Sequence, residues 1–170
     1  MSRAANPFWE FAGAVYSKPG VEAECLALQN KADVDVMLLL FAAFCGANRI
    51  ALTGDDIVAF VAETAALRSL LVTPLRSARS TLKRYVASPE EEQRYASIRD
   101  SVRSAELAAE RMAADRLLDL FGHRLASRPR SDCDLVLPSI DSLLVAAYGI
   151  NSGAREACSD LVRAARSMKM

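Results

Sequence analysis

Apolar side chains recur at alternating steps of three and four residues from Ile57 to Tyr85, and this spacing strongly constrains the fold. Such steps place them on one face of a helix, close to the seam of a coiled coil. A second seam of the same kind runs from Tyr95 to Met112. The sequence Ser88-Pro89-Glu90-Glu91 separates the seams, and its serine and proline are typical of a helix start. The two seams therefore predict a long antiparallel helical hairpin over residues 54–126.

Pro74 lies inside the first of these seams. A proline within a helix has no N–H group to donate, and its ring clashes with the carbonyl group four residues earlier. We therefore predict a kink or a break near residues 70–74, after which the helix resumes and continues to about Ala87.

The segment from Val36 to Ala47 is apolar at nearly every position. A membrane-spanning helix needs about 20 such residues, so this shorter run is typical of a helix buried in a protein core. Two short helices are expected before it. The first begins at Asn6-Pro7, where an N-cap residue precedes a proline, and the second follows the interruption at Lys18-Pro19-Gly20.

The part of the chain that follows the hairpin predicts a loop and two more helices. Residues 127–138 are rich in proline and arginine and predict the loop. A sixth helix, capped by Ser139 or Asp141, is expected to run to about Tyr148, and a last helix is expected over 154–168. We therefore predict a single all-α domain of six or seven helices over residues 1–170. Its parts are short helices with a buried helix (7–52), the long hairpin (54–126) and the C-terminal helices (139–168).

The composition argues against several classes of function. The chain carries 21 basic and 21 acidic residues, whereas general nucleic-acid-binding proteins usually have an excess of positive charge. Its single histidine, His123, argues against histidine metal sites and histidine-dependent catalytic triads. The glycine-rich phosphate motifs and the nucleophile elbow of hydrolases are also missing from the sequence. We therefore predict no catalytic residue, no metal site and no cofactor.

Four cysteines stand far apart in the chain, and none belongs to a C-x-x-C pair. Cys25 and Cys45 lie among apolar residues, where a free thiol behaves as a small buried hydrophobe. Scattered cysteines are typical of a reducing compartment, and the first residues lack the apolar stretch of a secretory signal. We therefore expect a cytoplasmic protein without a membrane span.

Positive charge is concentrated in one segment of the chain. Residues 68–88 contain five basic side chains and no acidic one, whereas the rest of the chain contains 16 basic and 21 acidic side chains. Within this segment Arg76, Arg79 and Lys83 follow one another at helical steps and therefore share one face of the helix. With the neighbouring Arg84 they form what we call the basic stripe.

Two interpretations of the basic stripe are open. Its cations can pair with Glu90 to Glu92, which an antiparallel hairpin brings close, or they can attract an acidic protein or RNA. Aromatic side chains that could stack on bases are sparse there, which favours a protein partner over RNA. We therefore predict a non-enzymatic adaptor or regulatory protein that binds a macromolecular partner through the stripe. A second, smaller group of cations stands at the end of the next helix: His123, Arg124, Arg128 and Arg130.

A different class of function is the alternative to an adaptor. The chain can be a binding protein or an enzyme for an apolar or phosphorylated small molecule, with a site inside the helical bundle near Trp9, Asp56 and Arg68. Trp9 is equally suited to core packing, and Asp56 to capping a helix. A third possibility is a homodimer in which the helical hairpin pairs with its copy.

The first third of the sequence resembles an uncharacterised family of small proteobacterial proteins, a domain of unknown function. The resemblance covers roughly residues 7 to 60. That family often has asparagine where this chain has Met37 and tryptophan where it has Phe44. The resemblance implies an all-helical cytoplasmic protein and brings no activity with it. The residues that carry it are Phe8-Trp9-Glu10-Phe11-Ala12, Val15-Tyr16, Pro19-Gly20-Val21, Cys25-Leu26, Leu28-Gln29 and the stretch Asp35–Phe41.

Overall fold

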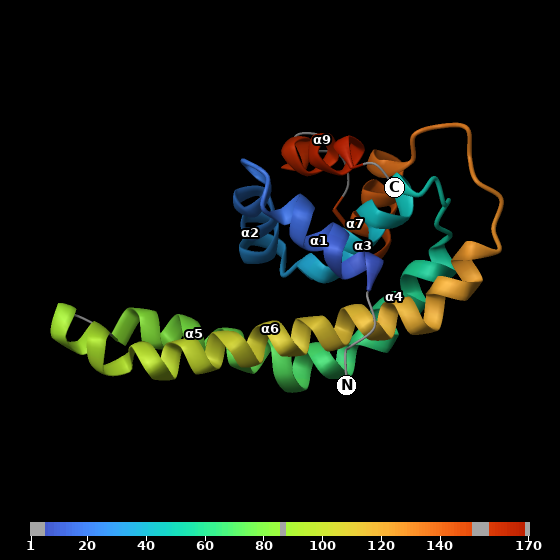
Figure 1. Cartoon of the computed structure of the whole chain (residues 1–170). Helices are drawn as coiled ribbons and strands as arrows, with labels where there is room; N and C mark the ends of the chain where they lie inside the picture. The colour runs from blue at the N-terminus through green and yellow to red at the C-terminus, as the bar shows by residue number, and fades with distance from the viewer. Residues whose placement is uncertain (1–5, 86–87, 151–156, 169–170) are drawn as a thin grey trace.

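A packed head and a helical arm that projects from it make up the molecule (Figure 1). The structure is a computed structural model that describes residues 6–85, 88–150 and 157–168. In chain order its helices are α1 (Pro7–Tyr16), α2 (Val21–Ala32), α3 (Val36–Ala47), α4 (Gly54–Leu67), the π-helical turn η1 (Arg68–Val72), α5 (Thr73–Tyr85), α6 (Pro89–Ala126), α7 (Val136–Tyr148) and α9 (Ser159–Ser167).

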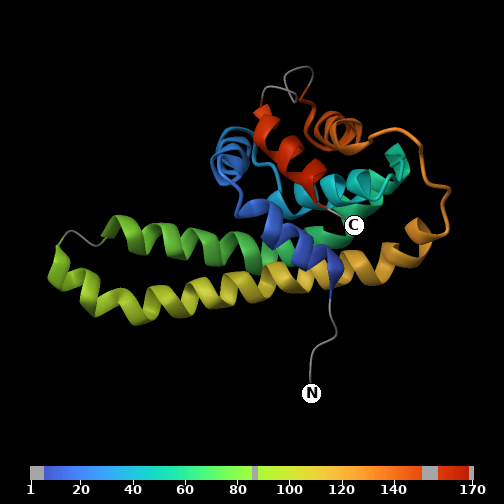
Figure 2. The ribbon, with the colours of Figure 1, turned by 45° about the horizontal axis from the view of Figure 1, so that its top comes forward.

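We call α5 and residues 89–106 of α6 the arm, and Figure 2 shows it extending beyond the other helices. The head consists of α1, α2, α3, α4, α7 and α9, together with the rest of α6. Because α4, η1 and α5 follow one another without a break, the described residues form seven helices and no strand. The prediction of an all-α fold with six or seven helices is therefore confirmed.

Helix α3 is buried in the head, as its apolar sequence predicts. The Asp35 side chain caps its start and accepts a hydrogen bond from the Met37 N–H at 2.8 Å. Every residue from Met37 to Gly46 is buried. The ring centroid of Phe41 lies 4.9 Å from that of Phe8 and 5.0 Å from that of Phe60, so α3 joins α1 to α4.

The two long helices form the predicted antiparallel hairpin. In the head α4 packs on α6, and the ring centroids of Phe60 and Phe121 are 4.6 Å apart. In the arm α5 packs on α6. The start of α1 is fastened to the same helix, because Asn6 caps α1 and its side-chain amide donates to Asp115 at 2.8 Å.

The predicted kink or break at Pro74 takes the form of the π-helical turn η1, and the helix continues beyond it. In this wider turn the N–H of Thr73 donates to the carbonyl of Arg68, five residues earlier. The added residue changes which carbonyl groups face the proline, which relieves the clash expected in a regular helix. The sequence thus marked the irregular position but not its form.

The predicted start of the sixth helix at Ser139 or Asp141 was wrong, because α7 begins at Val136. The carboxylate of Asp134 accepts a hydrogen bond from the Val136 N–H at 3.0 Å and satisfies one free donor of the first turn. Pro138 is tolerated in the first turn, where its missing N–H group costs no helical hydrogen bond. The preceding loop is accordingly shorter than predicted.

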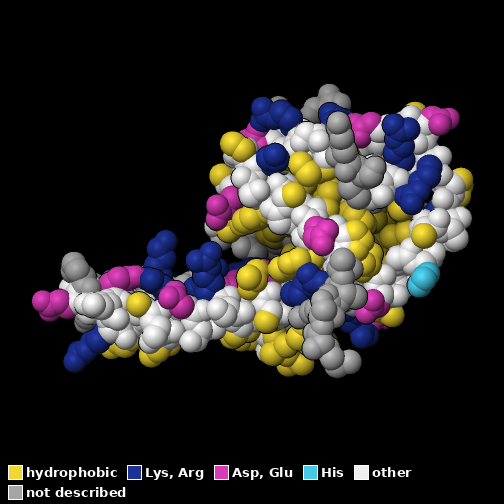
Figure 3. All heavy atoms as spheres, viewed as in Figure 1, with side chains coloured by type: hydrophobic (Ala, Val, Ile, Leu, Met, Phe, Trp, Pro, Cys, Tyr) yellow, Lys and Arg dark blue, Asp and Glu magenta, His cyan; other side chains and the backbone are white. Residues whose placement is uncertain are grey.

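The continuous helical stretch Gly54–Tyr85 is long and apolar enough, by length and composition alone, to cross a membrane. This is weak evidence, since core helices pass the same test. Here Ile57 and Phe60 are buried in the head, whereas Val58 is 67% and Leu70 is 73% exposed. Figure 3 shows hydrophobic side chains gathered at the lower edge of the molecule, where this stretch leaves the head.

Candidate functional site

The basic stripe is divided between two environments. Arg76 and Arg79, nearer the head, contact α6 and are partly buried. Lys83 and Arg84, nearer the tip of the arm, are exposed. The helical spacing therefore placed the four cations correctly on one helix, but only Lys83 and Arg84 are exposed.

Glu106 of α6 joins the two arginines that lie nearer the head. Nε of Arg76 donates to its Oε1 at 3.1 Å, and Nε of Arg79 donates to its Oε2 at 2.5 Å. Arg76 also donates through Nη2 to Oε1 of Glu110 at 3.0 Å. Only 7% of the Glu106 side chain is exposed, so these contacts are shielded from water and fasten α5 to α6.

The two glutamates of this cluster have opposite pKa shifts. Burial opposes ionisation of Glu106, but hydrogen bonds from Arg79 and Arg76 outweigh it and hold the pKa of its carboxyl below the ordinary value. Burial raises the pKa of Glu110, which receives a hydrogen bond from Arg76 alone among these arginines. Glu106 is therefore the carboxylate whose ionised form the two arginines stabilise, and it keeps both of them in place.

Replacing Glu106 by glutamine should loosen the arm without unfolding the head. Loss of this shielded carboxylate leaves Arg79 without its ionic partner and Arg76 with Glu110 alone, and the partial exposure of both arginines limits the cost to about 1–2 kcal/mol. Amide hydrogen exchange should speed up in residues 73–85 and stay slow in α3. Glu90→Gln changes an exposed residue on the same helix and is the control. It should leave the exchange rates of residues 73–85 and of α3 unchanged. Equal acceleration in α3 would contradict a local role for Glu106.

Lys83 and Arg84 are the cations of the stripe that remain available to a partner. Among the described side chains, neither forms an ion pair with Glu90 or Glu92, and Glu92 pairs instead with Arg99. The interpretation in which the stripe pairs with this turn is therefore unsupported for Glu90 and Glu92, while the Glu91 side chain lies outside the described residues. The acidic partners of the stripe are instead Glu106 and Glu110, which lie further along α6 than the glutamates at its start.

Two more exposed cations lie on the part of α6 that belongs to the arm, and the sequence analysis missed them. They are Arg94 and Arg103. Residues 89–170 contain 12 basic and 13 acidic side chains, so the net charge of this segment is close to zero and gives no sign of a local group of cations. Their helical register, read against the seam from Tyr95 to Met112, could have placed them on the outer face of the arm.

Large apolar side chains are also exposed on both helices of the arm and at its base. Tyr85 is 65%, Ile98 is 50% and the neighbouring Leu107 is 53% exposed. The ring centroids of Tyr85 and Tyr95 lie 6.0 Å apart in an edge-on arrangement across the two helices. The arm thus presents hydrophobic and cationic side chains together, which is typical of protein-binding surfaces.

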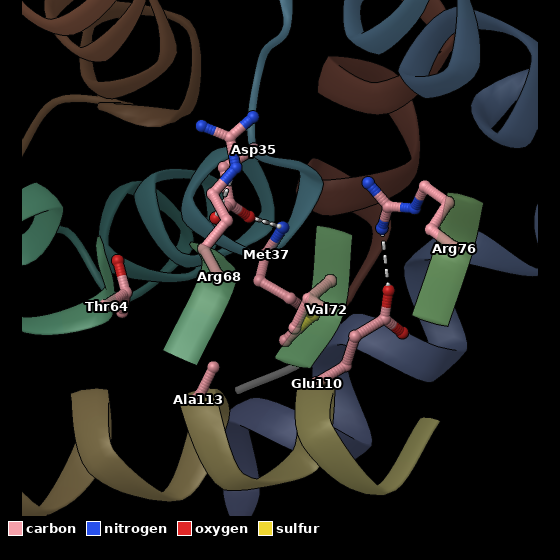
Figure 4. A pocket seen from close by; sticks show the side chains of 8 residues that line it. All are labelled: Asp35, Met37, Thr64, Arg68, Val72, Arg76, Glu110 and Ala113. Carbon is pink, nitrogen blue, oxygen red and sulfur yellow. Dashed lines mark hydrogen bonds and ion pairs between the residues drawn. The ribbon is translucent and has the colours of Figure 1, made fainter. Parts of the chain in front are cut away.

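Arg68 lies in η1, at the base of the arm, and fastens this turn to the head (Figure 4). Its Nη2 donates to the carbonyl of Asp33 at 2.6 Å, and its Nε lies 3.7 Å from Oδ2 of Asp35. The N–H of Asp35 in turn donates to the hydroxyl of Tyr148 at 2.9 Å. Figure 4 shows Arg68 and Arg76 at two sides of a narrow cavity of about 10 Å³, which is room for about one water.

Trp9 and Asp56, the other two residues predicted to bind a ligand, have partners of their own. The guanidinium carbon of Arg111 lies 5.4 Å from the centroid of the Trp9 ring. Asp56 is fully buried and accepts two hydrogen bonds from Arg128. Neither residue lines the cavity beside Arg68. The structure therefore does not bring the three predicted ligand residues to that one cavity.

Most of the cysteines are packed inside the protein as free thiols. Cys25, Cys45 and Cys158 are buried, as predicted for the first two, while Cys133 is exposed. Burial raises the pKa of the Cys25 and Cys158 thiols to about 12, so both stay protonated at neutral pH. Within the described part of the chain, no group of three or more histidine, cysteine, aspartate or glutamate side chains is placed to hold a metal ion.

Comparison with known sequences places the chain in a family without giving it an activity. The sequence model of a family described only as a protein of unknown function matches residues 7–117. The match extends well beyond the first third of the chain, and it includes the whole arm and the cluster around Glu106. No curated protein and no solved structure matches the chain.

Proposed function

The chain belongs to the DUF2390 family, whose function is unknown, and we propose that it is a non-enzymatic adaptor that binds an acidic protein partner through its arm. The binding surface combines Lys83 and Arg84 of α5 with the cations and the exposed apolar side chains of the facing part of α6. Arg76 and Arg79 then serve to position α5 rather than to contact the partner.

One observation carries the proposal: no residue of α5 is buried. A helix of 13 residues is marginally stable by itself in water, and α5 packs mainly against η1 and the neighbouring part of α6. Two helices alone bury little apolar surface, because each can cover only one face of the other. The outer face of the arm is therefore available for a partner, and covering it would stabilise the arm.

The charge of the arm supports an acidic partner. Its exposed cations outnumber its exposed acids among the described side chains, and the pairing of Arg76 and Arg79 with α6 does not remove this excess. Opposite charge on a partner speeds association and excludes partners of the wrong sign. A protein is favoured over RNA because the arm offers few aromatic side chains that could stack on bases, and Tyr85 and Tyr95 already contact each other.

The proposed setting is the cytoplasm. Three of the four cysteines are buried as free thiols, and no described cysteine forms a disulfide. Free cysteines persist most readily in a reducing compartment. This setting would supply the acidic proteins that the arm is proposed to bind.

The test uses a photo-reactive amino acid placed at Ile98 on the arm, and for comparison at Leu26 on the head. In native cells we expect one or a few protein adducts from the arm position alone. The double substitution K83E/R84E should reduce those adducts about tenfold or more, because it replaces attraction by repulsion at two adjacent positions. Circular dichroism should show unchanged helix content.

The matched control is K18E/K31E, which makes the same change of charge at two exposed lysines of the head. It should leave the arm adducts unchanged. Equal loss in both double variants would show that net charge, not the arm, governs binding. Adducts containing only a second copy of this chain would replace the adaptor with a homodimer formed through the hairpin, and light scattering over a range of concentrations would then show the dimer.

A further inference from the structure

A groove of about 710 Å³ opens on the head, on the side away from the arm and far from the basic stripe. It lies between the end of α3, the loop before α7 and the last turn of α9. Its volume falls within the range of about 300–1,000 Å³ that small-molecule sites occupy. Figure 3 shows basic side chains gathered beside the end of α9 and the loop that precedes α7.

Three arginines and one carboxylate provide the charge of this groove. Arg49, Arg130 and Arg166 line it with Asp134, which gives a net charge of +2. Arg166 pairs with Asp134, and Nη1 of Arg130 donates to the carbonyl of Asn48 at 2.6 Å. Arg49 is exposed and forms no ion pair with any described side chain. The Arg49 guanidinium is thus outside any direct ion pair among the described side chains, although its charge helps to lower the pKa of Asp134.

The backbone of Arg49 points to a role for its side chain. Arg49 follows the C-cap residue of α3 and has φ of 58°, in the left-handed region. Glycine is the usual residue at this position, because a side chain there costs conformational energy. A strained residue in a groove is a reason to look for function. An arginine here gives up some stability and places a guanidinium group at the groove.

The frame around these side chains is rigid. The carbonyl of Arg49 accepts a hydrogen bond from the N–H of Ser131 at 2.9 Å, so the loop is tied to the end of α3. A Cβ added to Gly46 would lie 2.5 Å from the carbonyl oxygen of Leu135, which shows how closely α3 approaches the start of α7. The groove is therefore formed by fixed backbone and not by loose chain.

The groove is also lined by apolar residues. Ala47 and Met168 are partly exposed there, whereas Val136 and Ala165 are buried beneath its surface. From this combination we infer that the groove binds a small phosphate monoester that carries an apolar group. The phosphate, with a charge of about −1.5 to −2 at neutral pH, matches the net +2 of the groove, and the guanidinium forks suit its oxygens. The apolar group lies against Ala47 and Met168. This site is separate from the proposed partner surface on the arm.

Phenyl phosphate is the probe that tests this inference, with inorganic phosphate and phenol as its two halves. In a calorimetric titration at low salt, phenyl phosphate should bind at least tenfold more tightly than either half. Arg49→Gly should weaken this binding about tenfold, the value of one charge-assisted hydrogen bond. The same variant should melt no lower than the wild type, since glycine relieves the backbone strain.

Arg163→Ala removes a charge from α9 outside the groove and is the matched control, for which unchanged binding is expected. Vesicles containing phosphatidic acid distinguish a lipid headgroup from a soluble phosphate ester. Binding that requires Arg49, in solution or on vesicles, supports the site and names its source. Failure of both probes to bind, or equal binding by wild type and Arg49→Gly, would overturn it.

Discussion

Asp56→Asn should lower the free energy of unfolding by about 3–5 kcal/mol, the range for breaking a buried ion pair from one side. Asp56 is fully buried, and its carboxylate accepts from Nη1 of Arg128 at 2.6 Å and from Nη2 at 2.9 Å. It also accepts from the N–H and the hydroxyl of Thr53, each at 2.8 Å. An asparagine of the same shape removes the negative charge and turns an NH₂ group toward one of these donors. Urea denaturation followed by circular dichroism measures the loss.

Asp55→Asn provides the control at the adjacent position. Asp55 is exposed in the first turn of α4, where an acidic residue stabilises only through the helix dipole. Its replacement should cost less than about 1 kcal/mol. Similar losses in the two variants would mean that the helix dipole, and not the pair with Arg128, accounts for the effect of Asp56.

The contribution of Asp56 should also depend on pH. Burial opposes its ionisation, but hydrogen bonds from Arg128 and Thr53 outweigh burial and lower the pKa of the carboxyl below its ordinary value of 3.8. The stabilisation is therefore fully present above that ordinary value and is lost as the pH falls through the lower pKa of the folded state. Wild type should approach the stability of Asp56→Asn in strong acid, and the gap should be largest near neutral pH.

The helical framework of this protein could be predicted from local sequence signals. Apolar spacing gave the hairpin, and the uniformly apolar run from Val36 to Ala47 gave the buried helix, because each pattern has one arrangement that removes its side chains from water. Capping residues located the helix starts at Asn6 and Ser88 within a residue. These features depend on neighbours along the chain, which a sequence displays directly.

The partners of charged residues could not be predicted in the same way. Arg76 and Arg79 are on the predicted face, but they pair with Glu106, about 30 residues away along the chain. That pairing depends on how α5 is aligned along α6. The π-helical turn at 68–72 adds a residue before α5 and so changes this alignment. The groove at Arg49 is still less accessible to sequence reasoning, since it joins segments from the middle and from the end of the chain.

Phe41→Ala should also be severely destabilising, by about 3–5 kcal/mol, because it opens a cavity in the buried core of the head. The Phe41 ring is fully buried and meets Phe8 and Phe60 edge-on, with Phe44 stacked at a centroid distance of 6.1 Å. Its removal therefore loses both the burial of an aromatic ring and its contacts with rings from α1 and α4.

Tyr85→Ala removes a ring of similar size from the arm and is the matched comparison. Tyr85 is 65% exposed and contacts the Tyr95 ring, so its loss should cost about 1 kcal/mol or less. Both values can be measured by thermal and urea unfolding. The contrast matters because it separates the two parts of the molecule: the head is stable through the burial around α3, whereas the arm leaves its aromatic surface exposed. A loss for Tyr85→Ala as large as that for Phe41→Ala would show that the arm is covered in the isolated protein, and a partner surface there would have to be abandoned.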